Sequence, residues 1–177
     1  MIREPHTPRV NWQTKMQEIG FGFHSIDGLY WQESYAYRFT SEQIDLIDDV
    51  TLELHQMCLE VVGDLIRRGD LSRLAIEQRW QTHIESSWEK REPGLLGRMD
   101  LAYDGHNPPK LLEYNADTPT SLIESSLAQW LWLKDVHPDA DQFNSLHEKL
   151  IARWQFIRNY WQSHGSTTHQ DSSLHFL

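Results

Sequence analysis

Residues 98–121 read RMDLAYDGHNPPKLLEYNADTPTS, and they contain two segments with the alternating pattern of β-strands. The segments LGRMDLAY (96–103) and KLLEYNA (110–116) are separated by an Asp104-Gly105 pair and by Pro108-Pro109, which favour turns. We therefore expect two short antiparallel strands joined by a long hairpin loop.

Polar side chains recur at every second position of these segments. Side chains two apart on a strand point to the same face. Glu113 is therefore expected to project with Asn115. By the same spacing, Arg98 is expected to project with Asp100. If the two faces coincide, Asp100, Glu113 and Asn115 supply three oxygen ligands of the kind that Mg²⁺ prefers, and Arg98 is placed to bind an anion or to offset charge that develops in a reaction.

Hydroxyl groups crowd the segment that follows the second strand. Thr118, Thr120 and Ser121 precede an apolar helical pattern, and the backbone N–H groups at a helix N-terminus can hold a carboxylate or phosphate. Ser121 with Glu124 also fits a capping box. The plainer alternative is that Ser121 is only the cap, that the strand carboxylates are solvated hairpin residues, and that Arg98 forms a surface ion pair.

Four main helices are expected around this hairpin. The first begins at a Thr40/Gln43 capping box and ends at Gly69. The others are expected over residues 71–89, from Ser121 to His137-Pro138, and from about Asp141 to Ser163. Residues 1–39 are predicted to be an irregular arm whose aromatic rings pack on the later helices, and SSLHFL (172–177) resembles the start of a strand. These elements predict an α+β fold.

Composition narrows the functional class. The 177 residues favour one domain, or a piece of a larger one, and a net charge of −10 argues against nucleic acid or an anionic membrane as a partner. No apolar run approaches the roughly 20 residues of a membrane span. The single cysteine, Cys58, lies on the apolar stripe of the first helix and is expected to be a buried packing residue. A protein of the cytoplasm is the default expectation.

Several separated motifs resemble the synthetase domain of the glutathionylspermidine synthase family, the ATP-grasp acid–amine ligases. They are R-x-D at 98–100, LLEYNADTPTSL at 111–122, QWLWL at 129–133, HQMCLEVV at 55–62 and YWQESYAY at 30–37. The likeness runs over nearly the whole chain. It implies that residues 1–177 are the N-terminal portion of a synthetase domain that continues beyond Leu177, and hence a partial ATP-grasp-type fold.

The resemblance also implies roles for the hairpin residues. Arg98 resembles the ATP-contacting arginine that stabilises the transition state. Asp100, Glu113 and Asn115 match the Mg²⁺ ligands. Two threonines, Thr118 and Thr120, stand where the family has serines near the peptide substrate. The implied reaction activates a carboxylate as an acyl phosphate with ATP and then joins it to an amine or polyamine.

Two parts of the family pattern are missing from these residues. There is no Cys/His amidase segment, so hydrolysis of the conjugate is not expected. The nucleotide clamp, with its lysines and Gly-rich loop, would lie beyond Leu177, so residues 1–177 alone are expected to show little or no ligase activity. The alternatives are a metal-dependent phosphoester hydrolase that uses the same carboxylates and a non-catalytic helical module that binds a partner chain. The identities of the acid and the amine stay open.

Overall fold

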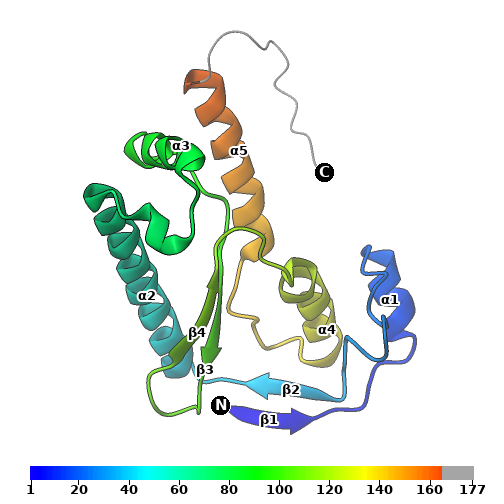
Figure 1. Cartoon of the computed structure of the whole chain (residues 1–177). Coiled ribbons are helices and arrows are strands. Elements are labelled where there is room, and N and C mark those ends of the chain that lie inside the picture. The colour runs from blue at the N-terminus through cyan, green and yellow to red at the C-terminus, as the bar shows by residue number, and fades with distance from the viewer. Residues whose placement is uncertain (165–177) are drawn as a thin grey trace. The chain divides into compact units, whose positions relative to one another are not determined.

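The computed structural model describes residues 1–164, which form five α-helices, short 3₁₀ and π segments and two two-stranded antiparallel sheets (Figure 1). The predicted α+β class is confirmed. The contacts of the chain gather in two compact units. One combines Met1–Ile47 with Leu96–Arg153, and the other combines Asp48–Leu95 with the chain from Trp154 onward. The predicted site residues all belong to the first unit.

The first 39 residues contain regular structure. β1 (Ile2–Pro5) pairs antiparallel with β2 (Tyr35–Arg38), and α1 (Trp12–Glu18) lies between them in the sequence. The prediction of an irregular arm was wrong for these segments because their local signals are weak. Each strand has four residues, and α1 has seven residues with no side-chain hydrogen bond from Asn11 at its start.

Aromatic rings of this arm form the core of the first unit. Phe21 is fully buried and clusters with Trp12, Met16 and Ala128. Its ring meets Trp31 edge to face with 5.9 Å between centroids, an arrangement that stabilises aromatic cores. Ala128 belongs to the helical segment after the hairpin, so the arm packs its rings on a later helical element, as predicted.

A buried ion pair fastens the arm to α4 (Gln129–Val136). Arg9 Nη2 lies 2.6 Å from Glu33 Oε1, and the two side chains are 8% and 0% exposed. Arg9 Nη1 also donates to the Leu131 carbonyl oxygen and to the Asp135 carboxylate, both on α4. Because an unpaired charge is costly to bury, Arg9 and Glu33 stabilise the arm only as a pair.

The predicted hairpin is present. β3 (Arg98–Ala102) pairs antiparallel with β4 (Lys110–Asn115), and a register shift between Asp100 and Leu101 marks an irregularity in the ladder. The two strands run side by side in Figure 1. Before the register shift, residues 98–100 pair directly with residues 113–115, and the candidate site lies on this part of the hairpin.

Asp104 organises the hairpin loop. Its carboxylate accepts hydrogen bonds from the backbone N–H groups of His106 and Asn107, each 2.8 Å long. The side-chain amide of Asn107 donates a third bond, and together these bonds lower the pKa of Asp104 to about 2. Gly105 adopts φ 87°, a backbone conformation that favours glycine.

The first long helix has the termini that the sequence predicts. α2 (Ser41–Arg68) begins with a reciprocal capping box, in which the Thr40 N–H donates to Gln43 Oε1 at 3.1 Å and the Gln43 N–H donates to Thr40 Oγ1 at 3.3 Å. Gly69 ends the helix with φ 69°, and its N–H donates to the Ile66 carbonyl oxygen.

Residues 71–89 divide into two helical pieces instead of one. Leu71–Leu74 forms a 3₁₀ turn and α3 spans Gln78–Glu89. Ala75 separates them with φ 58°, a left-handed conformation that does not continue a right-handed helix. Cys58 on α2 was expected to be a buried packing residue and is only half-buried, and α2 as a whole has no fully buried residue.

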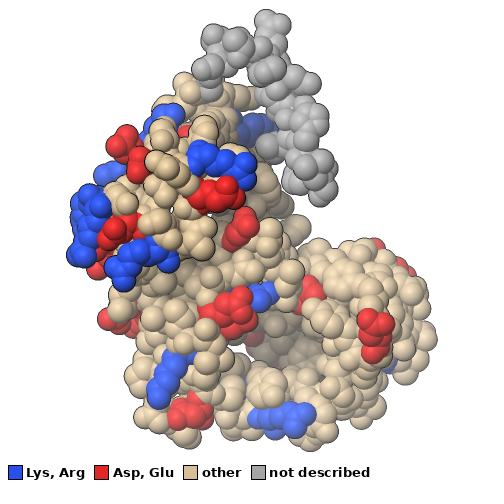
Figure 2. All heavy atoms as spheres, viewed as in Figure 1, with Lys and Arg blue, Asp and Glu red and all other residues tan. Residues whose placement is uncertain are grey.

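The last helix begins later than expected. α5 (Leu146–His164) starts after Asp141 because Phe143 adopts φ 48° and Asn144 Oδ1 accepts a hydrogen bond from the Leu146 N–H. The predicted strand near the C-terminus lies outside the described residues. Among residues 1–164, no helix has the length and apolar character needed to cross a membrane. On the face shown in Figure 2, basic and acidic side chains are interleaved.

Candidate functional site

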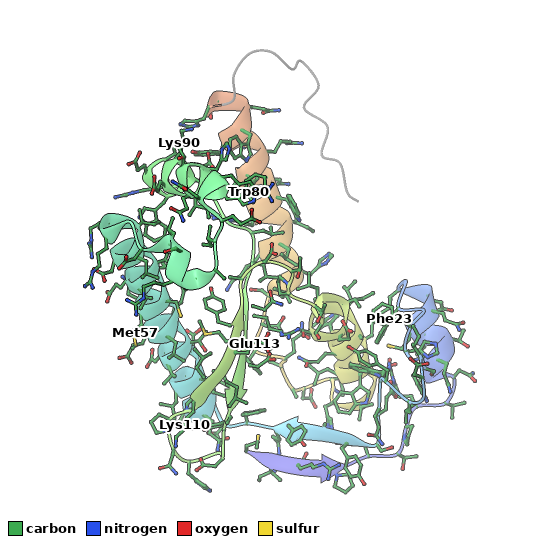
Figure 3. All side chains as sticks on the ribbon, viewed as in Figure 1. Phe23, Met57, Trp80, Lys90, Lys110 and Glu113 are labelled. Carbon is green, nitrogen blue, oxygen red and sulfur yellow. The ribbon has the colours of Figure 1, made fainter. Side chains whose placement is uncertain are left out.

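The strand register places the predicted polar residues on one face of the hairpin. Arg98 lies directly opposite Asn115, and Asp100 lies directly opposite Glu113. Residues paired in this way project to the same side of an antiparallel sheet. The side chains of these four residues therefore share a face, and Figure 3 shows Glu113 midway along β4.

Arg98 connects two groups that the sequence assigned to different roles. Its Nε donates to Asp100 Oδ1 at 2.9 Å, and its Nη1 donates to Thr120 Oγ1 at 2.7 Å. A weaker contact joins Nη1 to the Thr120 carbonyl oxygen at 3.4 Å. The Arg98 and Asp100 side chains are 33% and 44% exposed, so a ligand can reach both. The guanidinium thus bridges a candidate metal ligand and a candidate substrate-binding residue.

Asn115 shapes the turn that leads to the threonines. Its Oδ1 accepts hydrogen bonds from the backbone N–H groups of Asp117 at 3.2 Å and Thr118 at 3.1 Å. This is the geometry of an Asx turn, which reverses the chain locally. The same amide oxygen is the one predicted to hold a metal. In the described conformation it is therefore already a hydrogen-bond acceptor, and a cation would have to share it or take it from the turn.

The two carboxylates fit a magnesium ion better than the amide does. Asp100 and Glu113 are directly opposed like charges, which disfavour each other unless a cation lies near. Arg98 compensates Asp100, whereas Glu113 is exposed and forms no ion pair within residues 1–164. The described residues hold no group of three or more His, Cys, Asp or Glu side chains suited to a metal. Two carboxylates nevertheless suit Mg²⁺, which commonly takes its other oxygens from phosphates and water.

The chain enters the next helix by an unusual turn. Ser121 adopts φ 71°, a left-handed conformation rare for a non-glycine residue. The predicted capping box is absent because the Glu124 carboxylate accepts a hydrogen bond from the Tyr30 hydroxyl at 2.8 Å instead. Ser125 bonds through both its N–H and its hydroxyl to the Ser121 carbonyl oxygen. The helix then passes through a π-helical segment, Glu124–Ala128, before continuing as α4.

Tyr30 and Glu124 are neighbours of the site that the sequence did not single out as functional. They are 94 residues apart in sequence, so no local pattern connects them. Tyr30 does fall within the YWQESYAY segment that carries the family resemblance, and Glu124 follows Thr120 by four residues. The YWQESYAY segment and the short separation from Thr120 are the sequence features that could have pointed to Tyr30 and Glu124.

Comparison with known proteins agrees with the hairpin motifs. The family model described as glutathionylspermidine synthase preATP-grasp matches residues 3–176. A Haemophilus influenzae protein named "Putative acid--amine ligase" is 42% identical over 172 residues, which cover 94% of this chain and 43% of that protein. A Crithidia fasciculata protein named "Trypanothione synthetase" is 29% identical over 133 residues, which cover 71% of this chain and 18% of that protein. The chain therefore spans less than half the length of either relative.

Proposed function

The chain belongs to the glutathionylspermidine synthase family, whose preATP-grasp model it matches over residues 3–176, and on that basis we propose that it carries the metal- and phosphate-binding half of an ATP-dependent acid–amine ligase. The names of both relatives, "Putative acid--amine ligase" and "Trypanothione synthetase", support the ligase class over a phosphoester hydrolase or a binding module.

One observation carries the proposal. The register of β3 and β4 puts Arg98, Asp100, Glu113 and Asn115 on one face, and Arg98 extends from that face to the Thr120 hydroxyl at 2.7 Å. The Arg98 guanidinium joins the Asp100 carboxylate and the Thr120 hydroxyl, and Glu113 and Asn115 lie on the same face of the hairpin. The same arrangement suits a reaction in which a phosphoryl group passes to a carboxylate held nearby.

Each group has a proposed task. Asp100 and Glu113, with Asn115, would hold Mg²⁺, which when bound neutralises phosphate oxygens of ATP. Arg98 binds the transferred phosphoryl group and offsets the charge that develops on it. Thr118 and Thr120 donate hydroxyl hydrogen bonds to the acid substrate, which places its carboxylate next to that phosphoryl group.

The chemistry proceeds in two proposed steps. An oxygen of the substrate carboxylate attacks the γ-phosphorus of ATP, the bond to the β,γ-bridging oxygen breaks, and ADP leaves with an acyl phosphate formed. The amine nitrogen then attacks the acyl carbon, inorganic phosphate leaves, and the nitrogen loses a proton to yield the amide. No side chain of the protein needs to form a covalent bond, because positioning and electrostatic stabilisation suffice.

The substrates and setting follow from the same proposal. By analogy with the relatives, the acid is a peptide carboxylate and the amine is a polyamine or another alkylamine. The alignment covers 43% of the Haemophilus protein, and we propose that the residues holding adenine belong to the part of the family's fold outside that alignment. The low cysteine content is compatible with the cytoplasm, where both kinds of substrate would be available.

The test is amine-dependent ADP release by the full-length protein. Panels of small peptides and amines are supplied with Mg²⁺ and ATP, and ADP is measured with a coupled assay. We expect turnover that requires acid, amine and Mg²⁺, and we expect Glu113→Gln to reduce kcat by at least about tenfold. Asp45→Asn, an exposed carboxylate change on α2, is the matched control and should retain full activity.

Three results would overturn the proposal. The first is ADP release that needs no amine, and the second is phosphate release from simple esters at a comparable rate. The third is a Glu113→Gln variant as active as Asp45→Asn. Robust turnover by residues 1–177 alone would overturn the assignment of the adenine site to another part of the protein.

A further inference from the structure

Glu124 is a carboxylate beside the candidate site for which the metal and phosphate chemistry gives no role. It is half-buried and opens the π-helical segment Glu124–Ala128, a type of distortion that frequently accompanies functional sites. Within residues 1–164 no Lys, Arg or His side chain forms an ion pair with it, and the Arg98 guanidinium pairs with Asp100. A half-buried carboxylate without an ion-pair partner is stabilised when a cation binds it directly.

Tyr30 holds this carboxylate in place. Its hydroxyl donates to Glu124 Oε1 at 2.8 Å, while its ring packs against Phe21 and Phe23 with centroid distances of 6.1 and 6.0 Å. One carboxylate oxygen is thus fixed, and the other is left to accept a bond from a ligand. The Tyr30 ring is half-exposed, so the pair faces solvent and is open to a small molecule.

The Tyr30–Glu124 pair lies close to the residues of the proposed reaction. The hydrogen bond to Glu124 raises the pKa of Tyr30, and the Ser121 hydroxyl and the Arg98 charge lower it in smaller measure. These influences require Ser121 and Arg98 to be near the Tyr30 hydroxyl. Arg98 in turn contacts Thr120, so the Glu124 carboxylate adjoins the segment proposed to face the acid substrate.

We propose that Glu124 binds an alkylammonium group of a substrate and that Tyr30 is the positioning residue that orients its carboxylate. The inference rests on the proposed ligase function, because such an enzyme must bind an amine and because a peptide acid also carries an ammonium group. A carboxylate with one oxygen fixed by a neutral donor presents the other oxygen to an ammonium ion, and this is a strong, charge-assisted hydrogen bond. The net charge of −10 further favours cationic ligands over anionic ones.

The experiment compares ligands that differ by one ammonium group. The full-length protein is titrated calorimetrically in the presence of Mg²⁺ and a non-hydrolysable ATP analogue. One ligand pair is a glycine-terminated tripeptide with a free or an acetylated amino terminus, and the other is 1,4-diaminobutane or 1-aminobutane. We expect the wild type to bind the member with the extra ammonium group about tenfold more tightly in one of the pairs. If the affinity differs within the peptide pair, Glu124 binds the ammonium group of the acid substrate. If the affinity differs within the amine pair, Glu124 binds the ammonium group of the amine substrate.

Variants separate recognition from folding. Glu124→Gln retains the size of the side chain and should abolish the discrimination. Tyr30→Phe retains the ring packing and should reduce the discrimination without changing binding of the ATP analogue, a split that a merely structural role would not produce. Glu18→Gln, an exposed change at the end of α1, should match the wild type. Circular dichroism checks that each variant is folded.

The outcomes distinguish this inference from the ligase proposal. If the ATP analogue binds with Mg²⁺ but the wild type discriminates in neither pair, the Glu124 inference is wrong and the ligase proposal stands. The inference is also wrong if Glu124→Gln discriminates as well as the wild type. If the ATP analogue shows no Mg²⁺-dependent binding, the ligase proposal itself is wrong.

Discussion

Replacing Glu33 with glutamine removes the charge from a fully buried carboxylate. Glu33 accepts hydrogen bonds from the Arg9 guanidinium, from the Arg9 backbone N–H and from Trp31 Nε1. The Arg9 side chain is only 8% exposed, so water poorly replaces the Glu33 carboxylate. Removing one partner of a buried pair costs about 3–5 kcal/mol; because glutamine retains one acceptor oxygen and Arg9 keeps its ion pair with Asp135, we expect a loss at the lower end, about 3 kcal/mol in the free energy of unfolding.

The assay is urea denaturation at pH 7, followed by tryptophan fluorescence and by circular dichroism. Glu4→Gln is the control, because the Glu4–Arg38 pair has side chains 30% and 63% exposed and should contribute less than about 1 kcal/mol. Combining Glu33→Leu with Arg9→Met should cost less than the sum of the single changes, since no buried charge is then left unpaired. A Glu33→Gln variant within about 0.5 kcal/mol of Glu4→Gln would refute this account of how the arm is held.

Two further predictions concern local structure. Thr40→Ala removes the Oγ1 acceptor of the α2 capping box and should lower the free energy of unfolding by about 1 kcal/mol, measured by urea denaturation. The control Ser41→Ala should have little effect. Equal losses in the two variants would contradict the assignment of the cap to Thr40. Asp104 has a folded-state pKa of about 2 against an ordinary value of 3.8, so its hydrogen bonds stabilise the fold above about pH 4, and this stabilisation is lost as the pH falls toward 2. The Tm of the wild type should therefore fall more steeply between pH 4 and pH 2 than that of Asp104→Asn, and parallel curves would contradict the prediction.

Local sequence signals predicted the elements that depend on neighbouring residues. The α2 termini follow from Thr40, Gln43 and Gly69, whose hydrogen bonds and backbone angles are internal to the helix ends. The hairpin follows from alternation and from turn residues such as Gly105. The strand alternation also predicted that Asp100 projects with Arg98 and that Glu113 projects with Asn115, but it left open whether the two faces coincide; the register brings them to one side.

Long-range contacts determined what the sequence did not predict. β1 and β2 are four-residue strands that pair with each other although about 30 residues separate them in the sequence. No local pattern spans that separation, so the sequence did not predict the pairing. The sequence predicted that Glu124 forms a capping box with Ser121. In the structure the Glu124 carboxylate instead accepts a hydrogen bond from the hydroxyl of Tyr30, which lies in the N-terminal arm. The Asn115 amide oxygen, predicted only as a metal ligand, also closes the turn toward Thr118.

The central claim is that the paired carboxylates of the hairpin hold a divalent metal for the nucleotide. The most direct measurement is electron paramagnetic resonance of Mn²⁺, a spectroscopic substitute for Mg²⁺, titrated into the full-length protein with a non-hydrolysable ATP analogue. We predict that the wild type binds nucleotide-dependent Mn²⁺ and that Asp100→Asn weakens this binding by at least about tenfold, while Asp45→Asn does not. Equal Mn²⁺ affinity in Asp100→Asn and the wild type would contradict the claim.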